Sequence, residues 1–186
     1  MTKETLRDFE DTNLELLQLF SSFNQEQINA VPFEGSWTAG QLGEHLLKSD
    51  VLILKTLNGS MKQTERQPDE KIKIIKEMFL DFNTKMKSPD FNTPSNKAHD
   101  QEKLLNSLAE KRDQITKVIN TKNLSETCES FAVPDLGEFT RLEWIYFDIY
   151  HKQRHTHQLK NILQKVIKLN FKIKNEKDNF FYARLT

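Results

Sequence analysis

Two histidines one helical turn apart, His151 and His155, are the residues of this chain whose types and spacing most directly suggest chemistry. Because a helix turns through about 100° per residue, side chains four positions apart point in nearly the same direction. A third histidine, His45, lies far upstream in the chain. If a second helix brings it to the pair, three neutral imidazoles could bind a divalent ion at about 2.0–2.1 Å and leave a coordination position open. We therefore predict an open three-histidine metal site. The plainer alternative is that the histidines only form hydrogen bonds inside the core.

Long helices are the elements that must position these histidines. The chain has only five glycines and five prolines in 186 residues, which favours a few long helices over a sheet with many turns. Apolar residues recur at helical spacing, and the predicted helices cover about residues 3–24, 38–58, 69–86 and 96–121, with a last long helix from residue 140. The stretch 123–139 has an irregular pattern with breakers at Pro134 and Gly137, and no element is predicted there.

Capping signals set the starts of the two helices that carry the histidines. Thr38 with Gln41, and Thr140 with Glu143, each fit the capping box, in which two side chains satisfy orphan backbone N–H groups. Counting from the first cap, the helical period puts His45 on the inward apolar stripe. Counting from the second cap, it puts the histidine pair on the buried stripe of the last helix.

Four large aromatic residues flank these positions. Trp37, Trp144, Phe147 and Tyr150 could line a substrate pocket beside the metal. Large aromatic residues at helical spacing are more often plain core, so the core interpretation is preferred. Trp37, directly before the first cap, can also pack back on its helix as a hydrophobic staple.

Other polar residues have weaker claims to the site. Gln158 could hydrogen-bond a metal-bound water or simply fill the bundle. Glu44 and Asp148 could accept hydrogen bonds from imidazole N–H groups, although exposed helix carboxylates are more common. His157 lies about 200° round the helix from its neighbour in the pair, so it is expected on the surface. His99, in a polar stretch, is also expected to be exposed.

Charge and cysteine content narrow the functional class. Lys plus Arg and Asp plus Glu both number 27, and this lack of a basic excess argues against binding to nucleic acid. The local excess of Lys and Arg in 151–177 is interpreted as the end of a long helix whose cations complement the helix dipole. Cys128 is the single cysteine and is interpreted as a small structural residue, not a nucleophile. With no intramolecular disulfide, a polar N-terminus and only short apolar runs, the sequence predicts a cytoplasmic protein without membrane contact.

Two motifs carry a resemblance to a known family. One combines Val31-Pro32, Ser36-Trp37-Thr38, Leu42 and His45-Leu46, and the other runs from Pro134 to Trp144 and on to His151, His155 and Gln158. In this order they resemble the DinB/YfiT-like family of metalloenzymes. The resemblance implies an all-α four-helix bundle with up-down-down-up connections, here with an extra short helix, over residues 1–170. It also implies frequent homodimers and a divalent ion, zinc or nickel, held by His45, His151 and His155. The tail, 171–186, matches no motif, and no role is assigned to it.

The expected function follows from this centre. A divalent ion with three neutral ligands keeps its positive charge, so it can acidify a bound water or hold a thiolate. The first behaviour gives a hydrolase and the second gives a transferase that uses a low-molecular-weight thiol. Because the family includes thiol-dependent transferases and isomerases, the resemblance slightly favours thiol transfer on a small molecule. The alternative is a non-catalytic, stress-related helical protein that binds metal.

Overall fold

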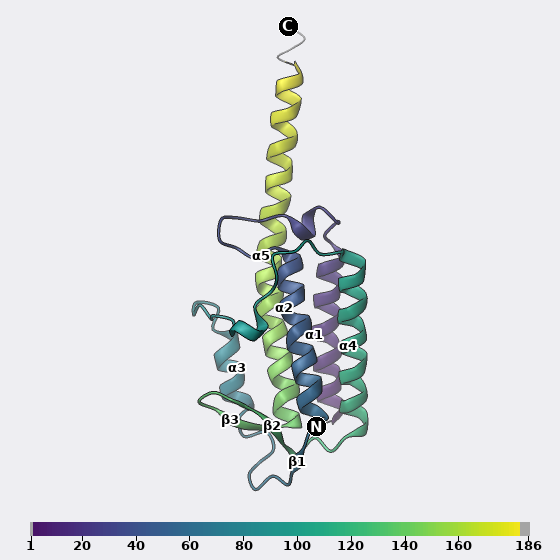
Figure 1. Cartoon of the computed structure of the whole chain (residues 1–186), viewed down its shortest axis with the longest axis vertical. Helices are drawn as coiled ribbons and strands as arrows, with labels where there is room; N and C mark the ends of the chain where they lie inside the picture. The colour runs from purple at the N-terminus through teal and green to yellow at the C-terminus, as the bar shows by residue number, and fades with distance from the viewer. Residues whose placement is uncertain (1, 183–186) are drawn as a thin grey trace.

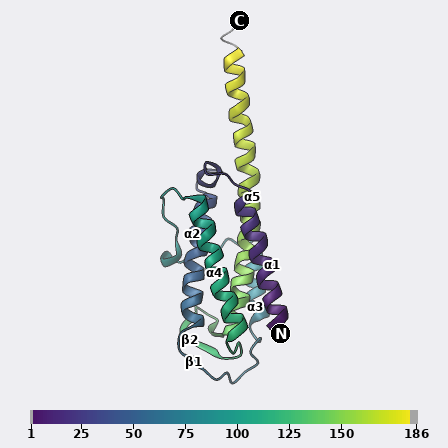
Figure 2. The same ribbon diagram turned by 90° about the vertical axis from the view of Figure 1, so that its right-hand side faces the viewer.

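The computed structural model describes the backbone of residues 2–182 and the side chains of residues 2–169. Four long helices form a bundle: α1 (Thr2–Ser21), α2 (Ala39–Leu57), α4 (Gln101–Thr121) and α5 (Arg141–Tyr182). In Figures 1 and 2, α1 and α5 run in one direction along the bundle, and α2 and α4 run in the other. The connection order is therefore up-down-down-up, as the resemblance implies.

An excursion between α2 and α4 makes this order possible. After α2 the chain forms β1 (Met61–Lys62), and α3 (Ile72–Leu80) then packs against α5 outside the bundle (Figure 1). The 3₁₀ turn η2 (Asp90–Asn92) leads on to the start of α4. The excursion returns the chain to the end of the bundle where α2 began, so α4 runs parallel to α2. The predicted extra short helix is α3, which is shorter than the predicted range 69–86.

A small antiparallel sheet lies at one end of the bundle and adds to the helical prediction. β2 (Thr127–Val133) and β3 (Gly137–Thr140) form a hairpin, and β1 pairs with β2. The prediction of no element in 123–139 is therefore wrong. The hairpin turn has positive φ angles at Asp135 (65°) and Gly137 (71°). Strands this short, with mixed burial, leave too little alternation of apolar and polar residues for the pattern to show.

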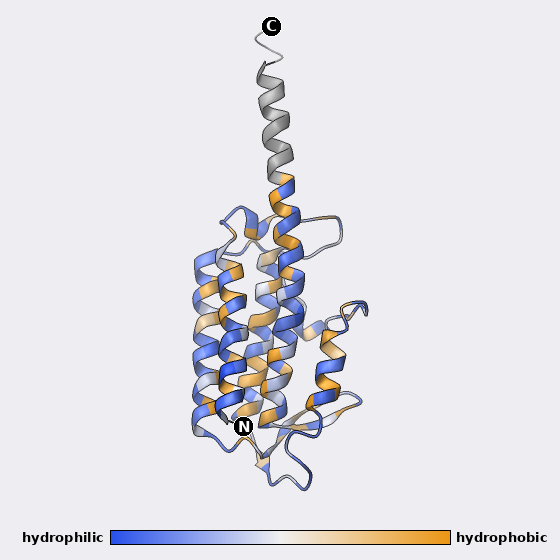
Figure 3. Cartoon of the chain, turned by 180° about the vertical axis from the view of Figure 1, so that it is seen from behind, coloured by the Kyte–Doolittle hydropathy of each residue, from blue (hydrophilic) through white to orange (hydrophobic). Residues whose placement is uncertain are grey.

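The bundle core consists of two apolar clusters separated by a buried polar layer. Ile53 and Trp144 belong to the cluster nearer the sheet, and Leu46 and Leu159 belong to the other. Figure 3 shows hydrophobic residues recurring among hydrophilic ones along the bundle helices. The buried polar layer comprises His45, Ser49 and Asp50 of α2 with Asp148, His151, Lys152, His155 and Thr156 of α5. Burying polar groups is costly unless they are paired or used, so a functional site is expected in this layer.

The backbone of α5 continues to Tyr182, through most of the segment 171–186 that matches no motif. Figure 1 shows this part of α5 extending beyond the other helices of the bundle. The side chains of residues 170–182, and residues 183–186 entirely, lie outside the described part of the chain. No helix within the described part is long and apolar enough to cross a membrane.

Candidate metal centre

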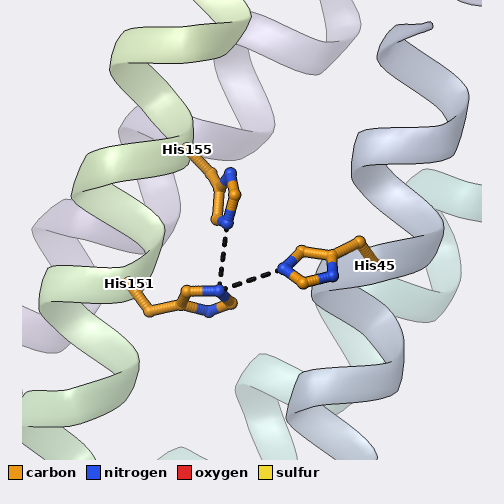
Figure 4. A group of neighbouring side chains, drawn as sticks. All are labelled: His45, His151 and His155. Carbon is orange, nitrogen blue, oxygen red and sulfur yellow. Dashed lines mark hydrogen bonds between the residues drawn. The ribbon is translucent and has the colours of Figure 1, made fainter. Parts of the chain in front are cut away.

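Three histidines from two helices meet in the buried polar layer. His45 comes from α2, and His151 and His155 come from successive turns of α5. Figure 4 shows their imidazole rings pointing toward one another between the two helices. The Nε2 atom of His151 lies 3.1 Å from Nε2 of His45 and 3.0 Å from Nε2 of His155. The structure thus brings the three predicted ligands together.

Local capping sets where each ligand points. The Thr38 hydroxyl accepts a hydrogen bond from the Gln41 backbone N–H, and the Gln41 side chain accepts one from the Thr38 backbone. Thr140 and Glu143 make the same two bonds at the start of α5. Both predicted capping boxes are therefore confirmed. Because each helix begins at a defined residue, the histidines fall on the two stripes that face each other.

The spacing of the nitrogens fits a divalent ion. Two nitrogens at about 2.0–2.1 Å from a tetrahedral ion lie about 3.3–3.4 Å apart, close to the two Nε2 separations. The three residues are 4%, 7% and 9% exposed in chain order, so an ion between them would be enclosed by protein. Within the described residues, this is the one group of three or more histidine, cysteine or carboxylate side chains placed to hold a metal ion.

Burial keeps these imidazoles neutral at neutral pH. It lowers the pKa of His45, lowers that of His151 well below the ordinary value, and lowers the pKa of His155 to about 3. The Nδ1 atom of His45 lies 2.9 Å from the Asn92 carbonyl oxygen, which can only accept, so Nδ1 donates. In the same way, His155 Nδ1 donates to Gln158 Oε1 at 3.0 Å. Both rings therefore present an unprotonated Nε2, the atom free to bind a metal.

His151 has the opposite tautomer. Its Nε2 lies within hydrogen-bond distance of two Nε2 atoms that carry no hydrogen, so His151 must be the donor. Its Nδ1 is then unprotonated, and this buried atom has no hydrogen-bond partner among the described residues. Binding an ion through Nε2 requires the hydrogen to move to Nδ1.

Asn92 supports His45 and is not predicted from the sequence. Its backbone carbonyl accepts the His45 Nδ1–H, and its side-chain amide donates to Ser49 Oγ at 2.7 Å. Ser49 Oγ in turn donates to the His45 carbonyl oxygen at 3.1 Å. These bonds tie η2 to α2 on both sides of the ring. Every residue has a backbone carbonyl, so the residue type at position 92 does not reveal this contact, and no sequence motif could have identified Asn92.

Aromatic side chains surround the rings. The Trp37 ring centroid lies 5.2 Å from that of the α2 histidine. The Phe79 centroid, from α3, lies 5.2 Å from that of His151, and the Phe147 centroid lies 6.0 Å from the same ring. Trp144 lies in the apolar cluster near the sheet, 1% exposed. The core interpretation therefore holds for Trp144, whereas Trp37 and Phe147 contact the centre.

Arg154 holds α3 beside the centre. Its guanidinium donates hydrogen bonds to the backbone carbonyls of Phe79, Asp81 and Thr84, where α3 ends. Arg154 stands between the two α5 histidines in the sequence, so one helix provides two ligands and the anchor of the neighbouring helix. The anchor keeps the Phe79 ring against the centre.

Glu44 lies away from the histidine centre, which corrects the prediction. Neighbouring residues on a helix point about 100° apart, so the residue before a ligand faces elsewhere. The Glu44 carboxylate accepts hydrogen bonds from Ser95, lies 2.9 Å from His99 Nε2 and pairs with Lys48. Although burial raises it, these contacts lower the pKa of Glu44 to about 2. The His99 side chain is only 13% exposed, so its predicted exposure is also wrong.

Of the other two polar candidates, one reaches the centre. Gln158 contacts it, and its role is to orient the His155 ring through the bond to Nδ1. Asp148 forms an ion pair with Lys152 and makes no hydrogen bond to an imidazole among the described contacts. The prediction of Asp148 as an imidazole partner is therefore wrong, because a buried lysine one turn away takes its carboxylate.

The remaining two candidates lie outside the centre, as predicted. His157 is exposed and stacks on Phe82, with the ring centroids 4.4 Å apart. Cys128 is fully buried in β2, and burial raises the pKa of its thiol to about 12. Such a thiol stays protonated and unreactive at neutral pH.

Known proteins resemble this chain in sequence or in fold. The uncharacterized protein YuaE of Bacillus subtilis (strain 168) is 28% identical over 162 residues, which cover 85% of this chain and 96% of YuaE. The four-helix bundle protein TT2238 superposes with a TM-score of 0.56 at 18% identity, covering 87% of this chain and 99% of its own. YfiT from Bacillus subtilis is described as a probable metal-dependent hydrolase with an unusual four-helix bundle topology. It superposes with a TM-score of 0.55 at 16% identity, covering 89% of this chain and 87% of its own. The sequence profile of the DinB superfamily matches residues 8–159, most of the chain, and the chain therefore belongs to the DinB superfamily.

Proposed function

We propose that this chain is a divalent-metal-dependent enzyme that acts on a small molecule, with zinc or nickel as the metal. The observation that carries the proposal is the convergence of three neutral imidazoles in the core. Burying three polar rings costs free energy that an apolar core would avoid, so their presence indicates a function. A divalent ion bound there would supply a positive charge that acidifies a coordinated water or stabilises a thiolate. His45, His151 and His155 would hold the ion and leave one position of a tetrahedral site for the substrate.

We favour thiol transfer as the reaction. The groups that contact the rings are neutral: the Asn92 carbonyl, the Gln158 amide and aromatic rings such as Trp37. The carboxylates of Glu44 and Asp148 are engaged elsewhere. A thiol has an ordinary pKa of about 8.5, against about 15.7 for water, so it ionises without help from a protein base. Surroundings without a base therefore suit a low-molecular-weight thiol better than water as the nucleophile.

Hydrolysis is the second candidate. YfiT, which shares this fold, is described as a probable metal-dependent hydrolase. A hydrolytic reaction here would depend on the ion alone to activate water. We therefore expect hydrolysis to be limited to substrates with good leaving groups.

Metal content tests the centre itself. We expect about one zinc or nickel ion per chain in protein purified without a histidine tag. His45→Ala should lose this ion, whereas His157→Ala, which removes an exposed histidine of α5, should keep it. Equal metal content in the wild type and His45→Ala would refute the site.

Activity panels test the reaction. Glutathione, cysteine and bacillithiol with an electrophile form one panel, and esters and amides form the other. Metal-dependent turnover of the first panel, lost in His45→Ala, supports thiol transfer, and the same result with the second supports hydrolysis. Turnover in neither panel by a metal-loaded protein supports the alternative, a non-catalytic, stress-related metal-binding protein.

A further inference from the structure

A second group of buried charges lies in the buried polar layer. Lys152 Nζ donates a hydrogen bond to Asp148 Oδ2 at 2.8 Å and lies 2.9 Å from Asp50 Oδ1. The three side chains are at most 1% exposed. Asp148 precedes His151 by three positions on α5, and helix positions with this spacing have Cβ atoms about 5–6 Å apart. The charged cluster is therefore an immediate neighbour of the histidines.

The cluster carries one negative charge more than its lysine neutralises. Two carboxylates face one ammonium, and Lys152 is the one cation in contact with either carboxylate among the described residues. Asp50 Oδ1 faces the Lys152 ammonium, and the Asp50 and Asp148 carboxyl groups also lie within hydrogen-bonding reach of each other. The ammonium also lies 5.4 Å from the centroid of the Phe9 ring. An unpaired charge in a core is strongly unfavourable, so the excess charge must be compensated, either by a proton on one carboxyl or by a cation nearby.

We propose that the Asp50–Lys152–Asp148 cluster is the counter-charge of the metal centre and makes it select a divalent over a monovalent ion. The inference rests on the proposed metal centre. Three neutral imidazoles bring no charge, so a divalent ion would otherwise place two uncompensated positive charges in the core. The excess carboxylate charge, on an adjacent turn of the same two helices, compensates one of them. The attraction between the carboxylate charge and the ion grows with the charge of the ion, so the cluster favours a divalent ion over a monovalent one.

Without an ion, a proton can take the same role. Burial raises the pKa of Asp50 to about 8, so this carboxyl holds a proton at neutral pH when the centre is empty. An arriving ion replaces that proton as the compensating charge, and the proton leaves to solvent. Asparagine has the shape of the protonated carboxyl, so Asp50→Asn should fold like the metal-free wild type.

Asp50→Asn tests the proposal. Its Zn²⁺ affinity should fall about 20- to 500-fold, the effect of one charge on the order of 9 Å from a divalent ion at an effective dielectric of about 20–40. Its Cu⁺ affinity, measured anaerobically against a competing chelator, should fall by only about the square root of that factor, because this ion has half the charge. The absorption spectrum of the Co²⁺-loaded variant should match that of the wild type, and its urea midpoint without metal should be equal or higher.

Matched variants separate charge from structure. Asp113→Asn removes an exposed carboxylate of α4 and should bind both ions like the wild type. Asp148→Asn keeps an oxygen acceptor for Lys152 and should repeat the difference between the two ions. Unchanged Zn²⁺ affinity in Asp50→Asn, or equal losses for Zn²⁺ and Cu⁺, would overturn the counter-charge role, and equal losses would show that Asp50 only maintains geometry. If the wild type binds neither ion, the metal centre fails first and the counter-charge role fails with it.

Discussion

Replacing Gln158 with leucine should weaken metal binding while the bundle stays folded. Gln158 Oε1 accepts the His155 Nδ1–H at 3.0 Å, and this bond keeps Nε2 of the ring directed at the other two histidines. Leucine is of similar size but offers no acceptor. The Nδ1–H is then left without a partner whenever Nε2 is bound to an ion.

The size of the effect follows from that bond. A buried donor without a partner costs about 1–3 kcal/mol, and because the Gln158 side chain is only partly buried we take about 1–2 kcal/mol. In the metal-free protein, the ring escapes this cost by moving its hydrogen to Nε2. With Nε2 on an ion it cannot, so the cost falls on the bound state. Since about 1.4 kcal/mol is a factor of ten, Zn²⁺ affinity should fall about 5- to 30-fold.

A competitive titration of Zn²⁺ against a chromophoric chelator measures this change. Gln153→Leu is the control, because Gln153 lies on the same helix and donates its hydrogen bond to Thr12, not to a ligand. Its Zn²⁺ affinity should match that of the wild type. If Gln158→Leu also stays within about twofold of the wild type, the bond does not orient His155 and the reasoning is refuted.

Acid should destabilise the metal-free protein through its histidines. Their pKa values are lower in the folded chain than in the unfolded chain, so the unfolded chain binds more protons below about pH 6.5. The urea midpoint should therefore fall as pH falls from about 6.5 toward 3. His155→Gln should make the urea midpoint depend less steeply on pH. An identical dependence in the variant would contradict the role of His155 in acid destabilisation. Arg154→Met removes the donor to three carbonyls at the end of α3 and should speed amide hydrogen exchange in α3. Arg112→Met, which removes a half-buried guanidinium of α4 that bonds to Asp113, should not. Equal exchange in both variants would show that α3 needs no anchor. Thr38→Ala removes half of a capping box and should lower the free energy of unfolding by about 1 kcal/mol in urea titrations, and no change would contradict the role of the cap.

The helices could be predicted because their signals are local. The Thr38 and Thr140 caps and the apolar periodicity each depend on residues within a few positions of one another. The hairpin could not be predicted in the same way. Its pairs join Thr127 to Thr140 and Met61 to Cys128, and such partners leave little trace in a local pattern. The excursion that carries α3 is likewise placed by contacts with α5.

The ligands could be predicted because a metal site needs particular side chains at particular spacings. The groups that support them follow other rules. Asn92 acts through its backbone carbonyl, and Phe79 reaches the centre from a helix outside the bundle. The predictions for Glu44 and Asp148 were wrong because each carboxylate had a closer cationic partner, and nearness in sequence to a histidine does not decide such pairing.

The ligands His45 and His151 are separated by 106 positions along the chain. An ion bound by both would close the intervening stretch of chain into a loop. This loop can form only when α2 and α5 are packed together in the bundle. Any fluctuation that parts α2 from α5 would first have to release the ion. Filling the centre should therefore merge the local openings of these two helices into a single cooperative event. Slowly exchanging amides would then be found along both helices, and removing the ion with a chelator would loosen α2 and α5 together.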